Sequence, residues 1–327
     1  MRKAFVTGGS GHLGANLVRL LLESGWHVRC LIHKDSKALE GLEIEKVHGD
    51  LTDLSSLSSQ MDGCDVVFHL AAYVAVEDVD VVRMKKINVE GTQNMCEAAL
   101  SANISRFIYF SSIHAFEQHP IGQILNEERP LVHASSNSSP YDYSKALAQK
   151  KVYAACKRGL NASILHPTAV LGPHDHKPSR MGQVLMNIMN RKMLLTVTAG
   201  YNWVDARDVA KSAINCVDFG KTSQNYILSG QWASFPQIAE IVSNKLKIRT
   251  TYATFPLWAA YAGIPFSWIK SKITAKRPSL TSGGLHALAV QSKIVSSELA
   301  QKELGHNTRT LEKTINDTID WRQKHVD

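Results

Sequence analysis

The sequence lacks a hydrophobic run long enough to span a bilayer. Its longest apolar stretch, residues 255–269, contains Pro256 and Pro265 and is too short and too interrupted for a membrane helix. The first expected strand starts at Arg2, which leaves no room for a signal peptide before it. There is also no internal repeat. We therefore expect a cytoplasmic protein without a membrane span.

Cysteine is scarce as well, with five cysteines in 327 residues, far apart and mostly in apolar segments. This spacing argues against a disulfide framework or a metal site and indicates reduced thiols in a core. Charge is plentiful: 37 Lys and Arg stand against 29 Asp and Glu, a formal net charge of +8. The cations are spread out, so we expect an anionic cofactor, a small-molecule substrate and no nucleic-acid partner.

The first stretch of the chain contains three regularly spaced glycines. A short apolar run leads into Gly8, Gly11 and Gly14, and an apolar face of helical period follows. The order predicts strand, tight turn and helix, which is the context of a dinucleotide-binding fingerprint. Gly8 makes the turn, Gly11 lets a pyrophosphate approach the backbone, and Gly14 lets the helix pack on its strand.

Strand-like and helix-like segments alternate through the first half of the chain. This alternation predicts an α/β fold, a Rossmann doubly wound parallel sheet. Further strands are expected at residues 27–32, 44–47, 65–70, 106–111 and 161–166. Helices are expected at residues 54–61, 88–102 and 141–158.

The composition changes after Pro167. A turn-rich loop at 172–178 precedes a methionine-rich helix at 180–190, and the chain is mostly helical from Ser234. Two segments, 203–209 and 225–228, are expected to return to the sheet. We therefore predict an NAD(P)-binding Rossmann domain over residues 1–167, to which 201–230 returns. Residues 168–200 and 231–327 are expected to form a smaller, mostly helical substrate lobe.

A second motif places Tyr141 four residues before Lys145. On a helix both side chains lie on one face, and the ammonium is expected to lower the pKa of the phenol by about 1–3 units. Ser112 directly follows a buried strand, at the edge where open α/β sheets bind ligands. Its hydroxyl can hold a carbonyl oxygen while Tyr141 donates a proton.

Together these motifs resemble the extended short-chain dehydrogenase/reductase family, over nearly the whole chain. The segments that carry the resemblance are TGGSGHLG at 7–14, GDLTD at 49–53, HLAA at 69–72, NVEGT at 88–92, SS at 111–112, YDYSK at 141–145, HPTAVLGP at 166–173 and WVDARDVA at 203–210. Within the family the chain is most similar to the dihydroflavonol reductase-like branch, of the NAD-dependent epimerase/dehydratase type.

The resemblance implies roles for individual residues. Ser112, Tyr141 and Lys145 would be the catalytic triad, with Lys145 also holding the nicotinamide ribose. The cofactor residues that we expect are Gly8, Ser10, Gly11, His12, Leu13, His33, Lys34, Asp50, Leu51, Leu70, Ala71, Ala72, Tyr141, Lys145, Pro167, Thr168 and Val170. His114 and Met181 are candidates for substrate contact. The alternative for His114 is a polar residue that only makes hydrogen bonds within the protein, and the alternative for Met181 is a core residue.

The end of the second expected strand bears on the choice of cofactor. An NAD site usually has an acid there, which binds the ribose hydroxyls and repels a 2′-phosphate. This chain has His33 and Lys34 at that point, and Asp35 lies beyond it. We therefore predict a preference for NADP(H). The alternative is that His33 and Lys34 only face the solvent, in which case NAD(H) remains possible.

Two departures from the family pattern bear on which type of reaction the chain catalyses. His166 stands where many members have arginine, and Ile113 with His114 replaces the acidic pair of sugar-nucleotide dehydratases. The leading interpretation is a reductase or dehydrogenase acting on a small, largely apolar carbonyl or alcohol. The alternatives are a nucleotide-sugar epimerase with retained NAD and a non-catalytic NADP-sensing protein; a homodimer stays open. The apolar side chains considered for the substrate pocket are Met181, Met186, Trp203, Phe255, Trp258, Tyr261, Phe266 and Trp268.

Overall fold

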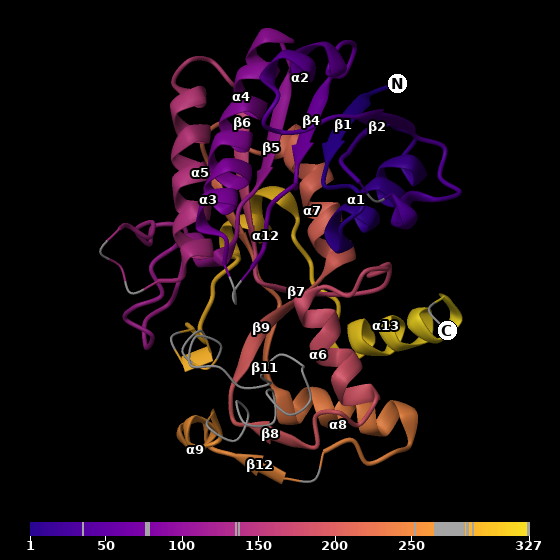
Figure 1. The fold of residues 1–327 in the computed structure, drawn as a ribbon, viewed down its shortest axis with the longest axis vertical. Helices are drawn as coiled ribbons and strands as arrows, with labels where there is room; N and C mark the ends of the chain where they lie inside the picture. The colour runs from indigo at the N-terminus through magenta and orange to yellow at the C-terminus, as the bar shows by residue number, and fades with distance from the viewer. Residues whose placement is uncertain are drawn as a thin grey trace.

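The computed structural model describes residues 1–34, 36–75, 79–134, 136, 138–251, 253–264, 285, 288–289 and 291–325. The chain forms a larger body with a central sheet and a smaller body beside it (Figure 1). The two aromatic residues Phe266 and Trp268, and also Asp35, lie outside the described residues.

The larger body is built on a seven-stranded sheet of order β10-β6-β5-β4-β1-β2-β3, with every neighbouring pair parallel. This is the doubly wound order, with β10 added at one edge, so the predicted fold class is confirmed. Both faces of such a sheet are covered, which explains why its central strands are almost wholly apolar. The strands are β1 (Lys3–Thr7), β2 (His27–Ile32), β3 (Glu45–His48), β4 (Val66–His69), β5 (Arg106–Phe110), β6 (Ala162–Pro167) and β10 (Asn225–Leu228).

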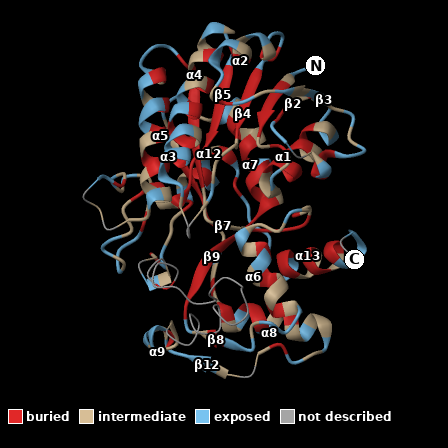
Figure 2. Cartoon of the chain, viewed as in Figure 1, coloured by how far each residue is buried: buried red, intermediate tan, exposed pale blue. Residues whose placement is uncertain are grey.

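Two hydrophobic cores hold helices against the two faces of this sheet. Leu17 and Leu21 belong to the core shared with α7 and α12, whereas Leu57, Met95 and Val152 belong to the opposite core. The central strands are accordingly buried (Figure 2). The helices on the first face are α1 (His12–Glu23), α7 (Ala206–Phe219) and α12 (Glu298–Leu304). Those on the other are α2 (Leu54–Gln60), α4 (Gly91–Ser101) and α5 (Pro140–Cys156), α4 being preceded by α3 (Val81–Met84) and a π-helical turn, Lys85–Glu90.

The smaller body has its own sheet and its own core. Its three strands have the order β11-β9-β7, and β12 pairs with β8 in a separate two-stranded ribbon. Trp203, Phe235 and Ile315 are among the side chains buried between this sheet and its helices. The strands are β7 (Ala169–Leu171), β8 (Leu195–Val197), β9 (Gly200–Asp205), β11 (Gln231–Ser234) and β12 (Ala253–Phe255). The helices are α6 (Arg180–Met189), α8 (Phe235–Leu246), α9 (Leu257–Ala262) and α13 (Leu311–His325).

The expectation that residues 203–209 return to the main sheet is wrong. That strand, β9, lies in the small sheet and ends at Asp205, where the carboxylate accepts a hydrogen bond from the Arg207 amide at 2.8 Å and caps α7. Segment 225–228 does join the main sheet, as β10. Helix α12 falls within the range predicted for the substrate lobe, yet Leu304 packs into the core of the larger body. The division into two domains itself stays a prediction.

None of the described helices has the length and apolar character needed to cross a membrane. The five cysteines are unpaired, and four of them are buried. In the described part of the chain, no group of three or more His, Cys, Asp or Glu side chains is arranged to hold a metal ion.

Candidate active site

The glycine-rich turn between β1 and α1 requires glycine at two positions. Gly8 has a φ of +72°, and a Cβ built on it would lie 2.7 Å from the Ala71 amide nitrogen. A Cβ on Gly14 would lie 2.2 Å from the Gly8 carbonyl oxygen. Helix α1 has no acidic side chain in its first turn, and its N-cap residue, Gly11, has no side chain that could accept hydrogen bonds from the first N–H groups. Its N-terminus therefore presents backbone N–H groups of the kind that bind a pyrophosphate.

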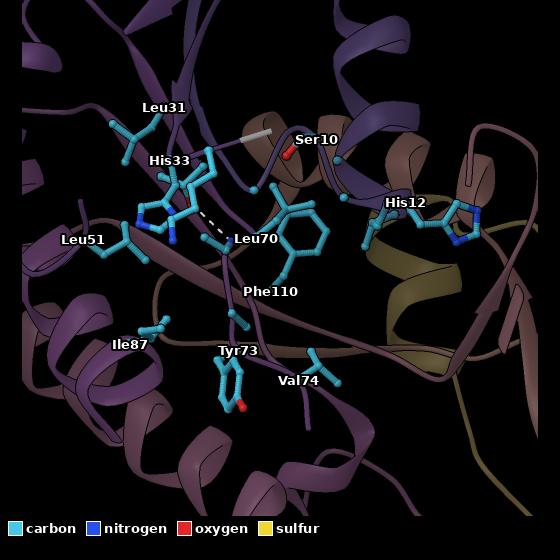
Figure 3. Close-up of a pocket in the computed structure, with 18 of the residues that line it drawn as sticks. Ser10, His12, Leu31, His33, Leu51, Leu70, Tyr73, Val74, Ile87 and Phe110 are labelled. Carbon is cyan, nitrogen blue, oxygen red and sulfur yellow. Dashed lines mark hydrogen bonds between the residues drawn. The ribbon is translucent and has the colours of Figure 1, made fainter. Parts of the chain in front are cut away.

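A cavity of about 630 Å³ opens beside this turn, at the carboxyl ends of the strands. Figure 3 shows Leu31, His33 and Leu51 at one end of it, and Tyr73 and Val74 along one wall. The expected cofactor residues that line the cavity are Gly8, Ser10, Gly11, His12, Leu13, His33, Lys34, Asp50, Leu51, Leu70, Ala71, Ala72, Tyr141, Lys145 and Pro167. Its volume and its glycine cradle suit a dinucleotide.

Other expected site residues lie outside the lining of this cavity. Thr168 donates a hydrogen bond to the Asn202 side chain at 3.1 Å, and Val170 packs against a core of the larger body. Met181, on α6, packs against the core of the smaller body. His114 lies 3.8 Å from the Asp142 carboxylate. Roles for these four residues at cofactor or substrate remain predictions.

His33 and Asp50 meet at the end of the cavity nearest β2. The His33 Nε2 lies 3.5 Å from a carboxylate oxygen of Asp50, and both side chains are about half exposed, at 56% and 51%. The pKa of Asp50 is lowered, first by the Thr52 amide, which donates to the carboxylate at 2.8 Å, and also by the Thr52 hydroxyl. This end of the cavity therefore carries a fixed carboxylate next to the cations His33, when protonated, and Lys34.

The three proposed catalytic residues come together where β5 and α5 meet. Ser112 follows β5 and is 8% exposed, and its side chain is close enough to Tyr141 to influence the pKa of the phenol. Tyr141 and Lys145 lie one turn apart on α5, whose start is fixed by a capping box between Ser139 and Asp142. The Lys145 ammonium donates to the Phe110 carbonyl at 2.7 Å.

Burial dominates the titration of these groups. It raises the pKa of Tyr141 to about 12, with a further rise from Asp142 and a partly opposing effect of the nearby Ser112 hydroxyl. Burial lowers the pKa of Lys145 to about 7. The expectation that Lys145 lowers the pKa of Tyr141 is therefore wrong for this structure. The reason is that the ammonium donates to a backbone carbonyl and is itself desolvated.

A buried polar network stands behind Ser112. His166 is 0% exposed; its Nδ1 lies 3.0 Å from the Ser112 carbonyl oxygen and its Nε2 lies 3.2 Å from Asn225 Oδ1. Gln149 links the same Asn225 oxygen, at 2.8 Å, to the Ser111 hydroxyl, at 3.1 Å. His166, which the sequence marked only as a departure from the family pattern, thus holds the backbone of Ser112.

The structure adds cavity residues that sequence reasoning missed. Arg83 stacks over the Tyr73 ring, with its guanidinium carbon 5.0 Å from the ring centroid. No sequence motif identifies Arg83 or Tyr73 as a cavity residue. Tyr73 lies in an irregular segment after β4, and Arg83 lies on the short helix α3. The further lining residues not assigned from the sequence are Leu31, Tyr73, Val74, Arg83, Ile87, Phe110, Ser111 and Lys177.

Comparison with known proteins places this geometry among related chains. The sequence model of the NAD dependent epimerase/dehydratase family matches residues 4–227. A Synechocystis protein named "Putative dihydroflavonol 4-reductase" is 33% identical over 98% of this chain and 94% of its own. The sterol demethylase protein B of Methylococcus capsulatus is 33% identical over 72% of this chain and 72% of its own.

Solved structures show the same architecture over the full length. The crystal structure of gox2253 superposes with a TM-score of 0.86 at 29% identity, covering 100% of this chain and 99% of that one. A dTDP-glucose 4,6-dehydratase from Streptomyces venezuelae, solved with NAD, gives 0.78 at 19% identity over 99% and 97% of the two chains. At that identity the likeness concerns the fold alone.

Proposed function

This chain belongs to the NAD-dependent epimerase/dehydratase family of NAD(P)-dependent enzymes, and on that premise we propose that it is an NADPH-dependent reductase of a small, largely apolar ketone or aldehyde. The observation that carries the proposal is that Tyr141 and Lys145 line the cavity together, with the Ser112 side chain close enough to Tyr141 to influence the pKa of its phenol. A phenol that keeps its proton at neutral pH is the acid that carbonyl reduction requires.

The residues of this chain supply the proton and the geometry, and the nicotinamide cofactor supplies the hydride when bound. Ser112 holds the carbonyl oxygen of the substrate beside the phenol. Tyr141 gives its proton to that oxygen as negative charge develops there. Lys145, with a pKa of about 7, is a proton source for the phenolate that remains, one helical turn away.

His33 and Lys34 support NADP(H) as the preferred cofactor. Both line the end of the cavity next to β2, where the 2′-hydroxyl or 2′-phosphate of the adenosine ribose would lie. Asp50 works against this preference, because its carboxylate is 3.5 Å from His33 and repels a phosphate. Lys34 adds a cation at the same end of the cavity, so NADP(H) is the proposed cofactor and NAD(H) the alternative.

Two sets of observations support an apolar substrate. Cavity-lining side chains include Val74, Ile87 and Phe110, and the turn after Ser112 buries Ile113. The names of the Synechocystis and Methylococcus relatives refer to a dihydroflavonol and to a sterol, which are ring compounds rather than nucleotide sugars. Of the apolar residues first considered for the pocket, Trp203 is instead a core residue at 2% exposure.

One preparation tests the proposal against its alternatives. We expect purified protein, when denatured, to release little nicotinamide nucleotide, because a reductase must exchange its cofactor at every turnover. We also expect it to oxidise one NADPH for each hydrophobic aldehyde or ketone reduced. Near-stoichiometric NAD⁺ in the supernatant, with UDP-sugar interconversion and no net NADPH consumption, would establish the epimerase instead. Cofactor binding without turnover of either substrate class would favour a sensing protein.

We further propose a cytoplasmic enzyme, which the five unpaired and mostly buried cysteines support. A homodimer is a prediction that light scattering on the purified chain checks.

A further inference from the structure

A second cavity, of about 700 Å³, lies beside α1 and contains none of the proposed catalytic residues. Its walls come from α1, from the first turns of α7, from the segment 305–309 that precedes α13, and from the loop after β7. It is bordered by four cationic side chains, Arg19, Arg207, Lys211 and Arg309, and by two acidic ones, Glu23 and Asp208.

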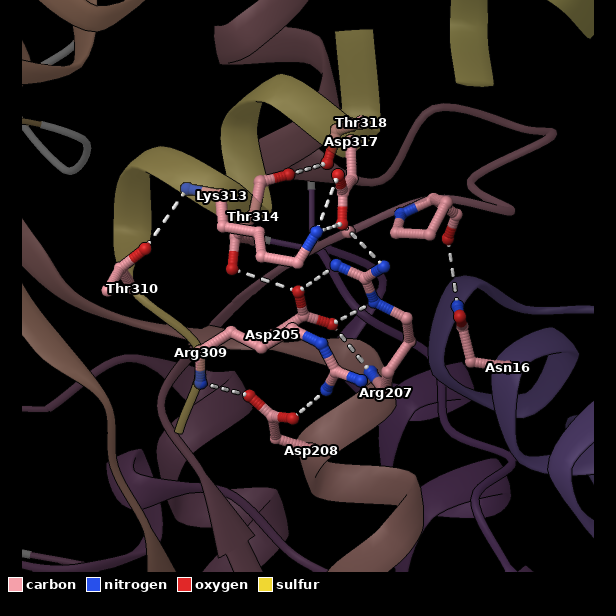
Figure 4. A network of polar contacts seen from close by, with 12 residues as sticks. Asn16, Asp205, Arg207, Asp208, Arg309, Thr310, Lys313, Thr314, Asp317 and Thr318 are labelled. Carbon is pink, nitrogen blue, oxygen red and sulfur yellow. Dashed lines mark hydrogen bonds and ion pairs between the residues drawn. The ribbon is translucent and has the colours of Figure 1, made fainter. Parts of the chain in front are cut away.

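Two of these cations are already neutralised. Arg207 contacts the carboxylates of Asp205, at 2.6 Å, and Asp317, at 2.7 Å. Arg309 forms an ion pair with Asp208, which also accepts from the Arg309 amide at 2.7 Å. Figure 4 shows this network joining α7 to α13. These ion pairs form one wall of the second cavity, referred to below as the cleft. Because Arg207 and Arg309 are both paired with carboxylates, neither carries an uncompensated positive charge.

The other two cations have no carboxylate within ion-pair distance among the described residues. Arg19 donates to the backbone carbonyls of Ala15, at 2.9 Å, and Ala38, at 3.0 Å. Its pKa is lowered by burial, which the charge of Glu23 on the next turn offsets only in part. Lys211 is exposed at the mouth of the cleft. A partly desolvated guanidinium and an ammonium without a carboxylate partner, both lining one cavity, favour binding of an anion there.

The loop that closes the cleft adds basic groups. His174 lines the cleft with a φ of 62°, unusual for a residue other than glycine. Its pKa is lowered to about 4, first by burial and then by Arg19, His176, His325 and His12. Of these four neighbours, Arg19 carries a permanent positive charge at this wall. Asp175 is the acid in this loop, but its carboxylate is occupied by the amide of Ser179, at 2.8 and 2.9 Å, and by its hydroxyl.

Neutral donors complete the lining. Asn307 and Thr308 are exposed in the segment before α13, and within the described chain neither side chain makes a hydrogen bond. Asn16, at the opposite wall, is 4% exposed and donates to the Pro173 carbonyl at 2.9 Å. Hydroxyl and amide donors next to two unpaired cations are the groups that recognise phosphate or carboxylate oxygens.

We propose that this cleft is a second binding site, for a small molecule that carries two or more anionic groups, either phosphates or carboxylates. Arg19 and Lys211 bind its charges from opposite helices, and Asn307 and Thr308 donate to its oxygens. The site is separate from the cofactor cavity but shares a wall with it. His12, which lines the cofactor cavity, lies 3.2 Å from the same Pro173 carbonyl that Asn16 binds.

Titration calorimetry on the full chain tests the site with two probes, inorganic pyrophosphate and citrate, at fixed ionic strength. The protein is first saturated with NADPH, so that neither probe can bind to the glycine-rich turn of the cofactor cavity. We expect saturable binding with one site per chain for at least one probe, and the stronger probe identifies phosphate or carboxylate as the preferred group. The double variant Arg19→Met/Lys211→Met is expected to weaken that binding by about tenfold or more, as the loss of charged hydrogen bonds implies.

Two further variants keep the result interpretable. Lys150→Met/Lys151→Met removes the same charge from exposed positions of α5 that line neither cavity, and its affinity for the probe should match the wild type. Lys211→Met alone removes an exposed side chain, so it tests the cleft even if loss of the Arg19 backbone contacts impairs folding. Absence of binding by both probes, or equal weakening in the α5 variant, would overturn the site. Binding unaffected by Lys211→Met and by the double variant would do the same.

Discussion

Replacing Tyr141 by phenylalanine separates proton donation from binding. The substitution keeps the ring on α5 and removes the hydroxyl that lies near Ser112. Positioned acids contribute about 10²–10⁴-fold to turnover, so kcat should fall by that factor, equivalent to about 3–5 kcal/mol in the activation barrier. Removal of one neutral hydroxyl should change the free energy of unfolding by only about 1 kcal/mol. The two magnitudes differ enough to be told apart.

The assay follows NADPH oxidation with a hydrophobic aldehyde or ketone, alongside fluorescence titration of NADPH and thermal melts. The cofactor dissociation constant should stay within about threefold of wild type, because the glycine-rich turn is untouched. Tyr143→Phe is the matched control: it removes a phenol two residues away that lines neither the catalytic cavity nor the second cavity beside α1. Turnover of Tyr143→Phe should equal that of wild type.

Turnover of Tyr141→Phe close to the wild-type value would refute the reasoning. It would mean that another acid, or water, protonates the carbonyl oxygen. Equal losses of kcat and NADPH affinity would also contradict it, since they would place the hydroxyl in cofactor binding rather than in proton transfer.

Three further outcomes follow from the geometry. In Gly14→Ala the new Cβ would lie 2.2 Å from the Gly8 carbonyl oxygen, so fluorescence titration should show that NADPH binding is lost. Unchanged NADPH affinity would contradict the assignment of the glycine-rich turn as the pyrophosphate site. Burial lowers the pKa of His69 to about 3 and of His166 to about 4, from 6.5, so the unfolded chain binds more protons as pH falls below 6.5. Stability is full above that pH and lost towards pH 4, about 2 kcal/mol per histidine by pH 5, which urea melts at pH 7.5 and 5 would measure. Lys34→Glu should raise the dissociation constant of NADPH by about tenfold and leave that of NADH nearly unchanged, as paired titrations would show.

The doubly wound sheet was predictable because its signals are local. Its central strands are short apolar runs bounded by turn residues, and Gly14 must be glycine for a reason visible in one segment, the nearby Gly8 carbonyl. The triad was predictable for the same reason. Ser112 follows a recognisable strand, and four residues on a helix separate Tyr141 from Lys145.

The small sheet could not be predicted with the same rules. Strand β9 pairs in parallel with β7 and antiparallel with β11, so its partners lie about thirty residues away on either side. Nothing in the run around Trp203 distinguishes this sheet from the larger one. A cap signal at Asp205 was present, however, and reading it as the start of α7 would have ended the expected strand four residues earlier.

The titration of the triad depends on burial, which the spacing of residues does not reveal. Four residues on a helix put Lys145 and Tyr141 on one face, and from that alone an ammonium favours the phenolate. In the folded chain Lys145 is 3% exposed and donates to the Phe110 carbonyl, so desolvation lowers its own pKa and weakens its charge at neutral pH. The same burial keeps the proton on Tyr141. A phenol that holds its proton until negative charge appears on a substrate oxygen can act as the acid in the carbonyl reduction that we propose.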